Sequence, residues 1–313
     1  MKKLAVIALC GLMAFPVGTT GFAAEEVTEE TTEVREEITE EAADEAEDET
    51  TEEGILTEDV LTDAGLTMED LQDAGLYYKT ISENGEADEY EREYRFAKAA
   101  ASLGSSEAML WLGELYQGGK VEAASEVEDP VQTAIEWWTM AYENGQPRGY
   151  ANIGLLYQHE SIPGGGDDYG DIPLDYEKAF EYFLAATDAG DTKAPRYVGM
   201  CYRDGTGVEA DLEKAVEYFK LASDLGDSTG KVYYADMLLA GEGTEQNVEE
   251  AMALYQDIVD TNGHDIALCA YKLGQIYDEG VYVEADAEKA AEYYQIAADN
   301  GSEDAQAALD AMN

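Results

Sequence analysis

Residues 194–226 read APRYVGMCYRDGTGVEADLEKAVEYFKLASDLG, and this stretch decides the predicted fold. In its second half, Ala215, Tyr218, Phe219 and Ala222 recur at helical spacing, beside charged positions such as Glu213. A short glycine-containing segment, DGTGV, precedes this half. The stretch therefore predicts two helices joined by a turn.

The same two phrases recur along the chain. The first appears as LGELYQGG from Leu112, IGLLYQH from Ile153, VGMCYRDGTGV from Val198, YADMLLAGEGT from Tyr234 and LGQIYDEG from Leu273. A second phrase follows each one and ends at a glycine. The glycines that close helical runs lie 36 to 45 residues apart, at Gly104, Gly145, Gly190, Gly226, Gly263 and Gly301. A period in this range predicts a solenoid of helix pairs.

Local signals at the helix ends agree with this division. Asp175, Asp211 and Asp286 stand where an N-cap belongs, and each is followed by an acidic residue in the first turn. The closing glycines can adopt the left-handed conformation that ends a helix. We therefore expect these aspartates to cap the second helix of their repeats.

A small residue recurs in the middle of each first helix. A glycine inside a helix costs about 1 kcal/mol relative to alanine, so its recurrence predicts a neighbouring helix packed too closely for a larger side chain. The positions are Gly113, Gly154, Gly199, Ala235 and Gly274.

At these residues the chain resembles the Sel-1-like repeat family, relatives of the tetratricopeptide repeat. Residues Ala194 to Gly226 follow the family pattern almost letter for letter, and five copies extend from Glu107 to Gly301. Repeat four departs from it, with Ala235 and Leu238 in place of the usual Gly and Tyr. The resemblance implies an all-α fold, a right-handed α-solenoid of about five to six helix-turn-helix repeats.

The chain divides into segments of different composition. We expect a signal peptide over 1–24, an acidic disordered spacer over 25–53, an N-terminal cap with a degenerate first repeat over 54–104, five repeats over 105–145, 146–190, 191–226, 227–263 and 264–301, and a C-terminal capping helix over 302–313. In the last helix, Ser302 is the expected cap, and Ala305, Ala308, Leu309 and Met312 form the apolar stripe.

The first segment has the features of an export signal. Lys2 and Lys3 precede an apolar run from Leu4 to Val17, and the small residues Ala23 and Ala24 follow. The run is shorter than the roughly 20 residues that span a bilayer, which favours cleavage over anchoring. We therefore expect a protein that is secreted or held in the cell envelope, without a membrane span.

The charge balance limits the possible partners. The chain carries 70 acidic and 18 basic residues, a formal net charge of -52, and 16 of the acids lie in the spacer. Nucleic acid is excluded as a general partner, because affinity for phosphates comes from Lys and Arg. The spacer itself is too charged to bury a core and is expected to act as a tether.

Residues suited to catalysis or metal binding are few. Cys201 and Cys269 lie two repeats apart, too far for a disulfide, and are expected to be small buried hydrophobic residues. His159 and His264 have no Cys or His at ligand spacing, so we expect surface or capping roles. No catalytic residue, metal or cofactor is predicted.

One loop concentrates oxygen ligands. The segment SIPGGGDDYGDIPLD from Ser161 contains Asp167, Asp168, Asp171 and Asp175. Such a loop could bind calcium, but the spacing lacks the alternating acids and terminal Glu of an EF-hand. An ordinary long inter-helix loop is the favoured interpretation.

The resemblance to tetratricopeptide repeats also implies which side of each first helix faces a ligand. Of the 15 basic residues beyond the spacer and signal, four fall on neighbouring first helices at these positions. The predicted groove residues are Trp111, Arg148, Asn152, Gln158, Lys193, Arg196, Tyr197, Arg203, Tyr233, Asp236, Lys272 and Gln275. They would hold a carboxylate or an acidic peptide. Alternatively, these bases neutralise nearby Asp and Glu across the stack.

Two functional hypotheses follow. The first is an exported, non-enzymatic interaction scaffold that presents its concave groove to a peptide or protein. The second is an extracytoplasmic hydrolase acting on a cell-wall or β-lactam-like substrate, by analogy with activities attributed to a few exported relatives. No Ser, Cys or His lies in an activating arrangement, so the first hypothesis is preferred.

Overall fold

The computed structural model describes residues 90, 94, 97, 98, 100, 101, 104–162, 165, 166, 169–261 and 263–312. All of these belong to one compact unit, Ala42–Asn313. The expected signal peptide and spacer, and most of the expected N-terminal cap, lie outside the described residues.

The described residues form helices and contain no strand. The helices are α5 (Ser106–Gln117), α6 (Glu122–Glu126), α7 (Pro130–Glu143), α8 (Arg148–Tyr157), α9 (Tyr176–Asp188), α10 (Ala194–Asp204), α11 (Leu212–Asp224), α12 (Ser228–Ala240), α13 (Val248–Asp260), α14 (Ile266–Glu279), α15 (Ala287–Asp299) and α16 (Glu303–Met312).

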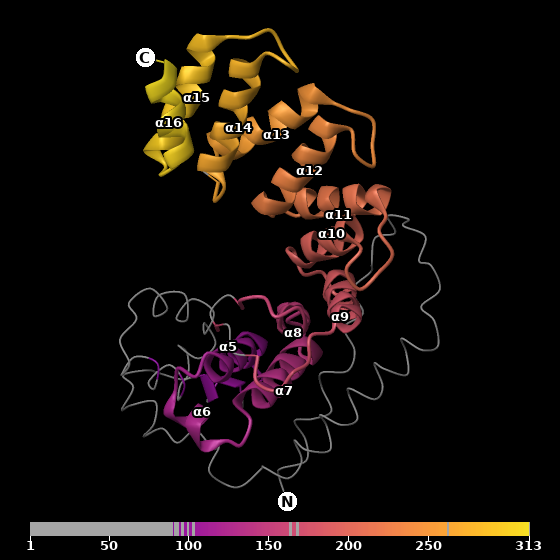
Figure 1. Cartoon of the computed structure of the whole chain (residues 1–313). Helices are drawn as coiled ribbons and strands as arrows, with labels where there is room; N and C mark the ends of the chain where they lie inside the picture. Colours follow the sequence, from indigo (N-terminus) through magenta and orange to yellow (C-terminus); the bar gives the residue numbers. More distant parts are fainter. Residues whose placement is uncertain are drawn as a thin grey trace, which may run out of the picture. The chain divides into compact units, whose positions relative to one another are not determined.

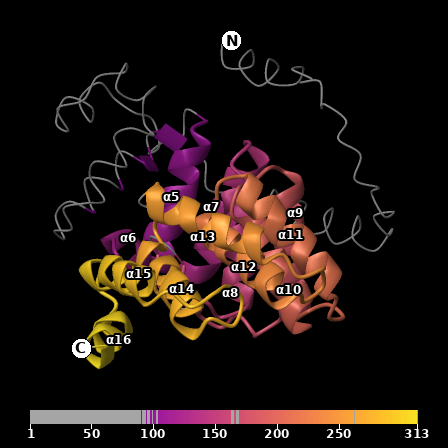
Figure 2. The ribbon, with the colours of Figure 1, turned by 90° about the horizontal axis from the view of Figure 1, so that it is seen from above.

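Five helix pairs follow one another along the chain. The pairs are α5 with α7, α8 with α9, α10 with α11, α12 with α13, and α14 with α15, and we call these repeats one to five. The second helix of each of repeats one to four also packs on the first helix of the next repeat, and α15 packs on α16, as Figures 1 and 2 show. The described chain is therefore an α-solenoid, as the sequence predicted.

The packing explains the small residue in each first helix. An aromatic ring of the second helix covers it so closely that a Cβ added to the glycine would lie within 2.3 to 2.7 Å of the ring atoms. The pairs are Gly113 with Trp138, Gly154 with Phe183, Gly199 with Phe219 and Gly274 with Tyr294. In repeat four, Ala235 is fully buried, and so is Tyr255 of the facing helix. The prediction of close helix packing is confirmed.

This contact gives a test in repeat three. Alanine at a helix-interior glycine normally stabilises a helix by about 1 kcal/mol. At Gly199 the added Cβ would meet the Phe219 ring at 2.7 Å, so we expect Gly199→Ala to destabilise the protein. The expected net loss is about 1 to 3 kcal/mol, measured by chemical denaturation. A stabilised Gly199→Ala variant would show that the ring yields without cost.

The predicted helix caps are present. Asp175, Asp211 and Asp286 accept hydrogen bonds from backbone N–H groups three residues on, at 3.1, 3.0 and 3.1 Å. Five of the six closing glycines have positive φ, between 89° and 93°. Gly263 is the exception, so the prediction of a left-handed closing residue is wrong there.

Both ends of the described stack are covered. At the C-terminal end, Ser302 accepts a hydrogen bond from the Ala305 N–H at 3.2 Å, and Ala308 and Leu309 pack on the core of repeat five. Met312, which we expected to share that stripe, is 38% exposed. At the other end, buried alanines at 97, 100 and 101 pack against repeat one.

Candidate partner-binding face

Predicted groove residues of repeat two contact the first helices of the repeats on either side. Between repeats one and two, the side chain of Asn152 donates a hydrogen bond to Glu114 Oε1 at 3.3 Å. Between repeats two and three, Gln158 Nε2 lies 3.5 Å from the Sγ of Cys201. These contacts join α5, α8 and α10 into one continuous side of the stack.

The same side continues through repeats four and five. The guanidinium carbon of Arg203 on α10 lies 5.1 Å from the ring centroid of Tyr233 on α12. Lys272 on α14 forms an ion pair with Asp236 on α12, with an N–O distance of 2.9 Å. We call this side, defined by the twelve predicted groove residues, the first-helix face.

The twelve residues differ in their access to solvent. Asn152 is only 1% exposed, so its inclusion among partner-contacting residues is wrong: its side chain is buried against Glu114. Lys193 is exposed, and the other ten residues are partly buried. Their packing leaves each of these side chains a restricted surface for a partner.

Two arginines of the face are held by aspartates at the repeat boundaries. Arg148 Nη2 lies 3.0 Å from Asp191 Oδ1, and Arg196 Nη1 lies 3.0 Å from Asp227 Oδ1. Each aspartate also accepts backbone N–H bonds at the start of the next first helix. Removing one partner would leave a buried charge without compensation, which is costly. The alternative of neutralisation across the stack is thus correct for these two arginines.

The remaining cations of the face do not pair with the aspartates at the repeat boundaries. Arg203 pairs with Asp204, its neighbour in sequence, at 2.7 Å, and its side chain is 31% exposed. Lys193 has no ion pair with any residue that the structure describes. It lines a cavity of about 410 Å³ together with Arg196 and His264. The Asp204 carboxylate accepts from two nitrogens of Arg203, so Lys193 is the position that keeps uncompensated positive charge on the surface of a strongly acidic chain.

A small polar network lies where α12, α13 and α14 meet. The Tyr255 hydroxyl donates a hydrogen bond to Asp236, which also pairs with Lys272. Burial, and the nearby Asp236 carboxylate, raise the pKa of Tyr255 above its usual range. The phenol therefore stays protonated and acts as a donor, which orients Asp236 on the face.

The cysteines and histidines show no catalytic arrangement among the residues that the structure describes. Cys201 and Cys269 are free and fully buried, as predicted. Burial raises the pKa of Cys269 to about 12 and that of Cys201 above its usual value, so neither is an activated thiolate. His159 is exposed, stacks on Tyr169, and its Nε2 lies 2.9 Å from the Ile172 carbonyl oxygen.

The aspartate-rich loop gives no sign of a metal site in its described part. Asp175 serves as the cap of α9, and Asp167 and Asp168 lie outside the described residues. Over the described ranges, no group of three or more His, Cys, Asp or Glu side chains is placed to hold a metal ion. Within the same ranges, no helix has both the length and the hydropathy to cross a bilayer.

Sequence reasoning missed one surface feature. Tyr176 and Leu212 begin α9 and α11, directly after the capping aspartates, and are 42% and 40% exposed. They lie outside the buried stripe of their helices. One signal in the sequence could have revealed this surface: an apolar residue recurs at the first position of these helices, outside the stripe that is buried.

The geometry defines a class of protein: an α-solenoid built from short helix pairs. The chain belongs to the Sel1 repeat family, whose sequence profile matches residues 106–146, 164–191, 194–227, 230–256 and 267–302. The second matched segment begins after α8, in the long loop of repeat two. Proteins with this repeat are generally scaffolds for protein–protein interaction.

Solved structures with a similar fold come from several bacteria. A Sel1 repeat protein from Oxalobacter formigenes is 25% identical over 75% of this chain and 86% of that chain, with a TM-score of 0.58. Immunity protein Pa5087 from Pseudomonas aeruginosa is 18% identical over 72% and 81%, with a TM-score of 0.46. A protective antigen of uropathogenic Escherichia coli with an SLR fold is 21% identical over 76% and 58%, with a TM-score of 0.41. No curated protein matches the chain.

Proposed function

We propose that this protein is an exported, non-enzymatic scaffold that binds a peptide or protein partner on its first-helix face. The observation that carries this proposal is that the first helices of all five repeats contact one another along one side of the stack. An extended binding surface of this kind is what a stack of helix pairs provides.

The chemistry of the face supports an acidic or carboxylate-bearing partner. Arg203 and Lys193 supply positive charge, and Tyr197 and Tyr233 supply rigid aromatic surface beside them. Arg196 is held in place by Asp227, and its Nη2 also donates to the Tyr197 hydroxyl at 2.8 Å. Because Asp227 already neutralises Arg196, this arginine positions the Tyr197 ring on the face.

The partner can be sought by site-specific crosslinking in the organism that makes the protein. A photo-crosslinking amino acid at Gln275 or Tyr233 reports on the first-helix face, and the same group at the exposed Glu217 of α11 is the control. We expect a crosslinked product only from the face positions. Equal products from Glu217 would contradict a binding role for the face.

Charge reversal tests the recognition itself. Arg203→Glu with Lys193→Glu is expected to abolish that product, since both side chains lie on the face and neither forms an ion pair with the aspartates Asp191 and Asp227 at the repeat boundaries. Lys220→Glu is the matched control, because Lys220 is exposed on α11 and pairs with Asp224 in its own helix. Loss of the product with Lys220→Glu as well would point to general charge attraction.

Export is part of the same proposal. It rests on Lys2, Lys3 and the apolar run that follows them. Mass spectrometry of the mature protein is expected to find Glu25 as its first residue. An intact Met1 in the cell interior would contradict export and leave the binding face to be tested alone.

A further inference from the structure

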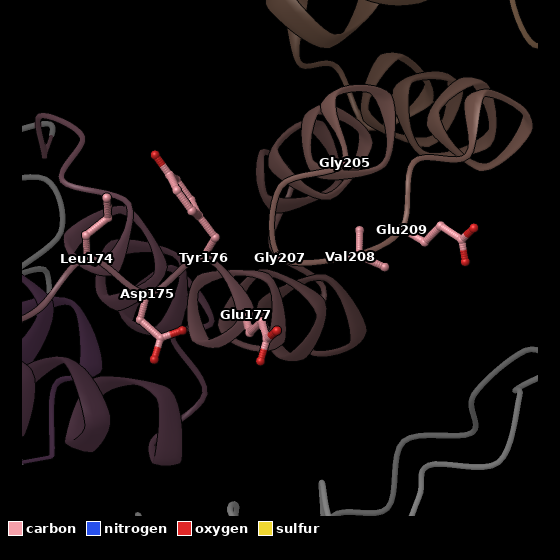
Figure 3. A pocket seen from close by; sticks show the side chains of 8 residues that line it. All are labelled: Leu174, Asp175, Tyr176, Glu177, Gly205, Gly207, Val208 and Glu209. Carbon is pink, nitrogen blue, oxygen red and sulfur yellow. The ribbon is translucent and has the colours of Figure 1, made fainter.

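A second surface lies at the N-terminal ends of the second helices. Where α9 begins, an open cavity of about 540 Å³ lies between this helix and the loop after α10. Leu174, Tyr176 and Val208 line it, and the first two are 49% and 42% exposed. Figure 3 shows the loop from Gly205 to Glu209 passing beside Tyr176.

Only acidic side chains accompany these apolar residues. Asp175, Glu177 and Glu209 line the same cavity, and its described lining contains no Lys or Arg. In Figure 3 the carboxylates of Asp175 and Glu177 point to the side of α9 opposite Tyr176. Glu209 belongs to the loop after α10, so acidic residues line the cavity both from α9 and from this loop.

The exposed lysine that follows Glu177 in sequence does not line this cavity. Lys178 follows Glu177, but its Nζ lies 5.3 Å from the ring centroid of Tyr157, within the same repeat. Repeat three does the same: Lys214 lies 5.1 Å from the Tyr202 ring. Both ammonium groups thus lie over tyrosines of their own repeats, outside the lining of the cavity, and Glu177 and Glu213 are exposed.

The arrangement recurs one repeat later. Leu212 occupies the position of Tyr176 at the start of α11 and is 40% exposed, with Glu213 beside it. The backbone fits in the same way: a Cβ on Gly207 would lie 2.0 Å from the Tyr176 carbonyl oxygen, and one on Gly243 would lie 2.1 Å from that of Leu212. We call the surface formed by Leu174, Tyr176 and Val208 with Asp175, Glu177 and Glu209 the acidic edge; Leu212 and Glu213 repeat its pattern one repeat later.

We propose that the acidic edge binds a basic protein segment in which apolar side chains alternate with Lys or Arg. The apolar side chains would cover Tyr176 and Leu174, and the cations would meet Glu177 and Glu209. Burial of exposed apolar surface supplies affinity, at about 25 cal/mol per Å², and opposite charge supplies selection. The chemistry is opposite to that of the first-helix face.

Charge complementarity also decides between possible occupants. The segment 25–53 of this chain has 16 acidic residues and one basic residue, so it would be repelled by the edge. A second copy of the protein carries the same net charge of -52 and would be repelled as well. A basic partner is the occupant that fits both components of the surface.

Two short fluorescent peptides test this proposal, one alternating lysine with leucine and the other alternating lysine with serine. Binding is measured by fluorescence anisotropy at about 0.15 M salt, where weak long-range attraction is screened. We expect the lysine–leucine peptide to bind more tightly. The double variant Leu174→Ser, Tyr176→Ser should weaken that binding about tenfold or more, with an unchanged helical signal in circular dichroism.

A matched pair of charge variants completes the experiment. The double variant Glu177→Gln, Glu209→Gln should weaken binding of the lysine–leucine peptide. The control is the double variant Glu217→Gln, Glu292→Gln, which changes exposed acids elsewhere on second helices and should leave this binding unchanged. Equal binding of the two peptides, or full binding by the Leu174→Ser, Tyr176→Ser variant, would overturn the proposal. Variants of Arg203 should leave this binding unchanged, so failure here is distinguishable from failure of the first-helix face.

Discussion

Replacing Trp138 with alanine is expected to lower the free energy of unfolding by about 3 to 5 kcal/mol. The indole is fully buried in repeat one, and it fills the space above Gly113 that a side chain would otherwise occupy. Its Nε1 donates a hydrogen bond to the Leu110 carbonyl oxygen at 3.2 Å. Alanine would leave a cavity and also remove this donor.

The effect should extend to the next repeat. A Cβ on Gly149, near the start of α8, would lie 2.1 Å from the Trp138 carbonyl oxygen, so α7 and α8 are in backbone contact at this residue. In a stack of repeats, stability depends on each unit and on its interface with the next. We therefore expect Trp138→Ala to lower both the midpoint and the cooperativity of urea denaturation, monitored by circular dichroism.

Two variants separate the cause. Repeats two and three have a phenylalanine, Phe183 and Phe219, at the position of Trp138. Trp138→Phe should therefore lower the free energy of unfolding less than the alanine variant does. Trp137→Ala removes the adjacent, partly buried indole and should also cost less. If Trp137→Ala were as destabilising as Trp138→Ala, the close contact with Gly113 would not be the source of the effect.

Much of this packing could be predicted from the sequence, because it is local to one repeat. The small residue of the first helix and the aromatic residue of the second recur together, so the repeat pattern around Gly199 is enough to predict a close helix contact. Capping residues such as Asp211 are equally local, since side chain and backbone partner are three residues apart. Gly263 shows the limit: the sequence places a closing glycine there, but the turn uses another conformation.

The contacts between repeats could not be predicted in the same way. The repeat pattern placed Arg196 on the first-helix face but did not identify Asp227 as its partner, because that pairing depends on how one repeat is rotated on the next. For the same reason Asn152 was expected to be accessible and is buried. The contact of Lys178 with the Tyr157 ring was also missed, although both residue types recur in register with the repeats.

Replacing Glu114 with glutamine is expected to remove a pH-dependent loss of stability. Burial raises the pKa of Glu114 to about 8. The hydrogen bond from Asn152 and the charges of Lys120 and Arg148 lower this pKa, but their combined effect is smaller than that of burial. A carboxyl whose pKa is higher in the folded state stabilises that state when protonated. Its contribution is complete below the reference value of 4.5 and is lost as the pH rises to about 8.

The wild type should therefore become less stable relative to Glu114→Gln across this interval, by about 2 to 4 kcal/mol in total. Glutamine keeps the shape and the acceptor oxygen for Asn152 but cannot ionise, so its own curve should be flatter. The measurement is urea denaturation of both proteins at a series of pH values between 4.5 and 8. The difference between the two curves isolates this group from the other acids of the chain.

Glu107→Gln is the control for the loss of one negative charge, since Glu107 is exposed on the same helix. It should run parallel to the wild type over the whole interval. Parallel curves for wild type and Glu114→Gln would instead mean that Glu114 ionises without cost, with Lys120 and Arg148 compensating its charge. Divergence at Glu114 alone would place a neutral carboxyl at the junction of α5 and α8 near neutral pH, so that the contact between these two helices carries one negative charge fewer than the sequence implies.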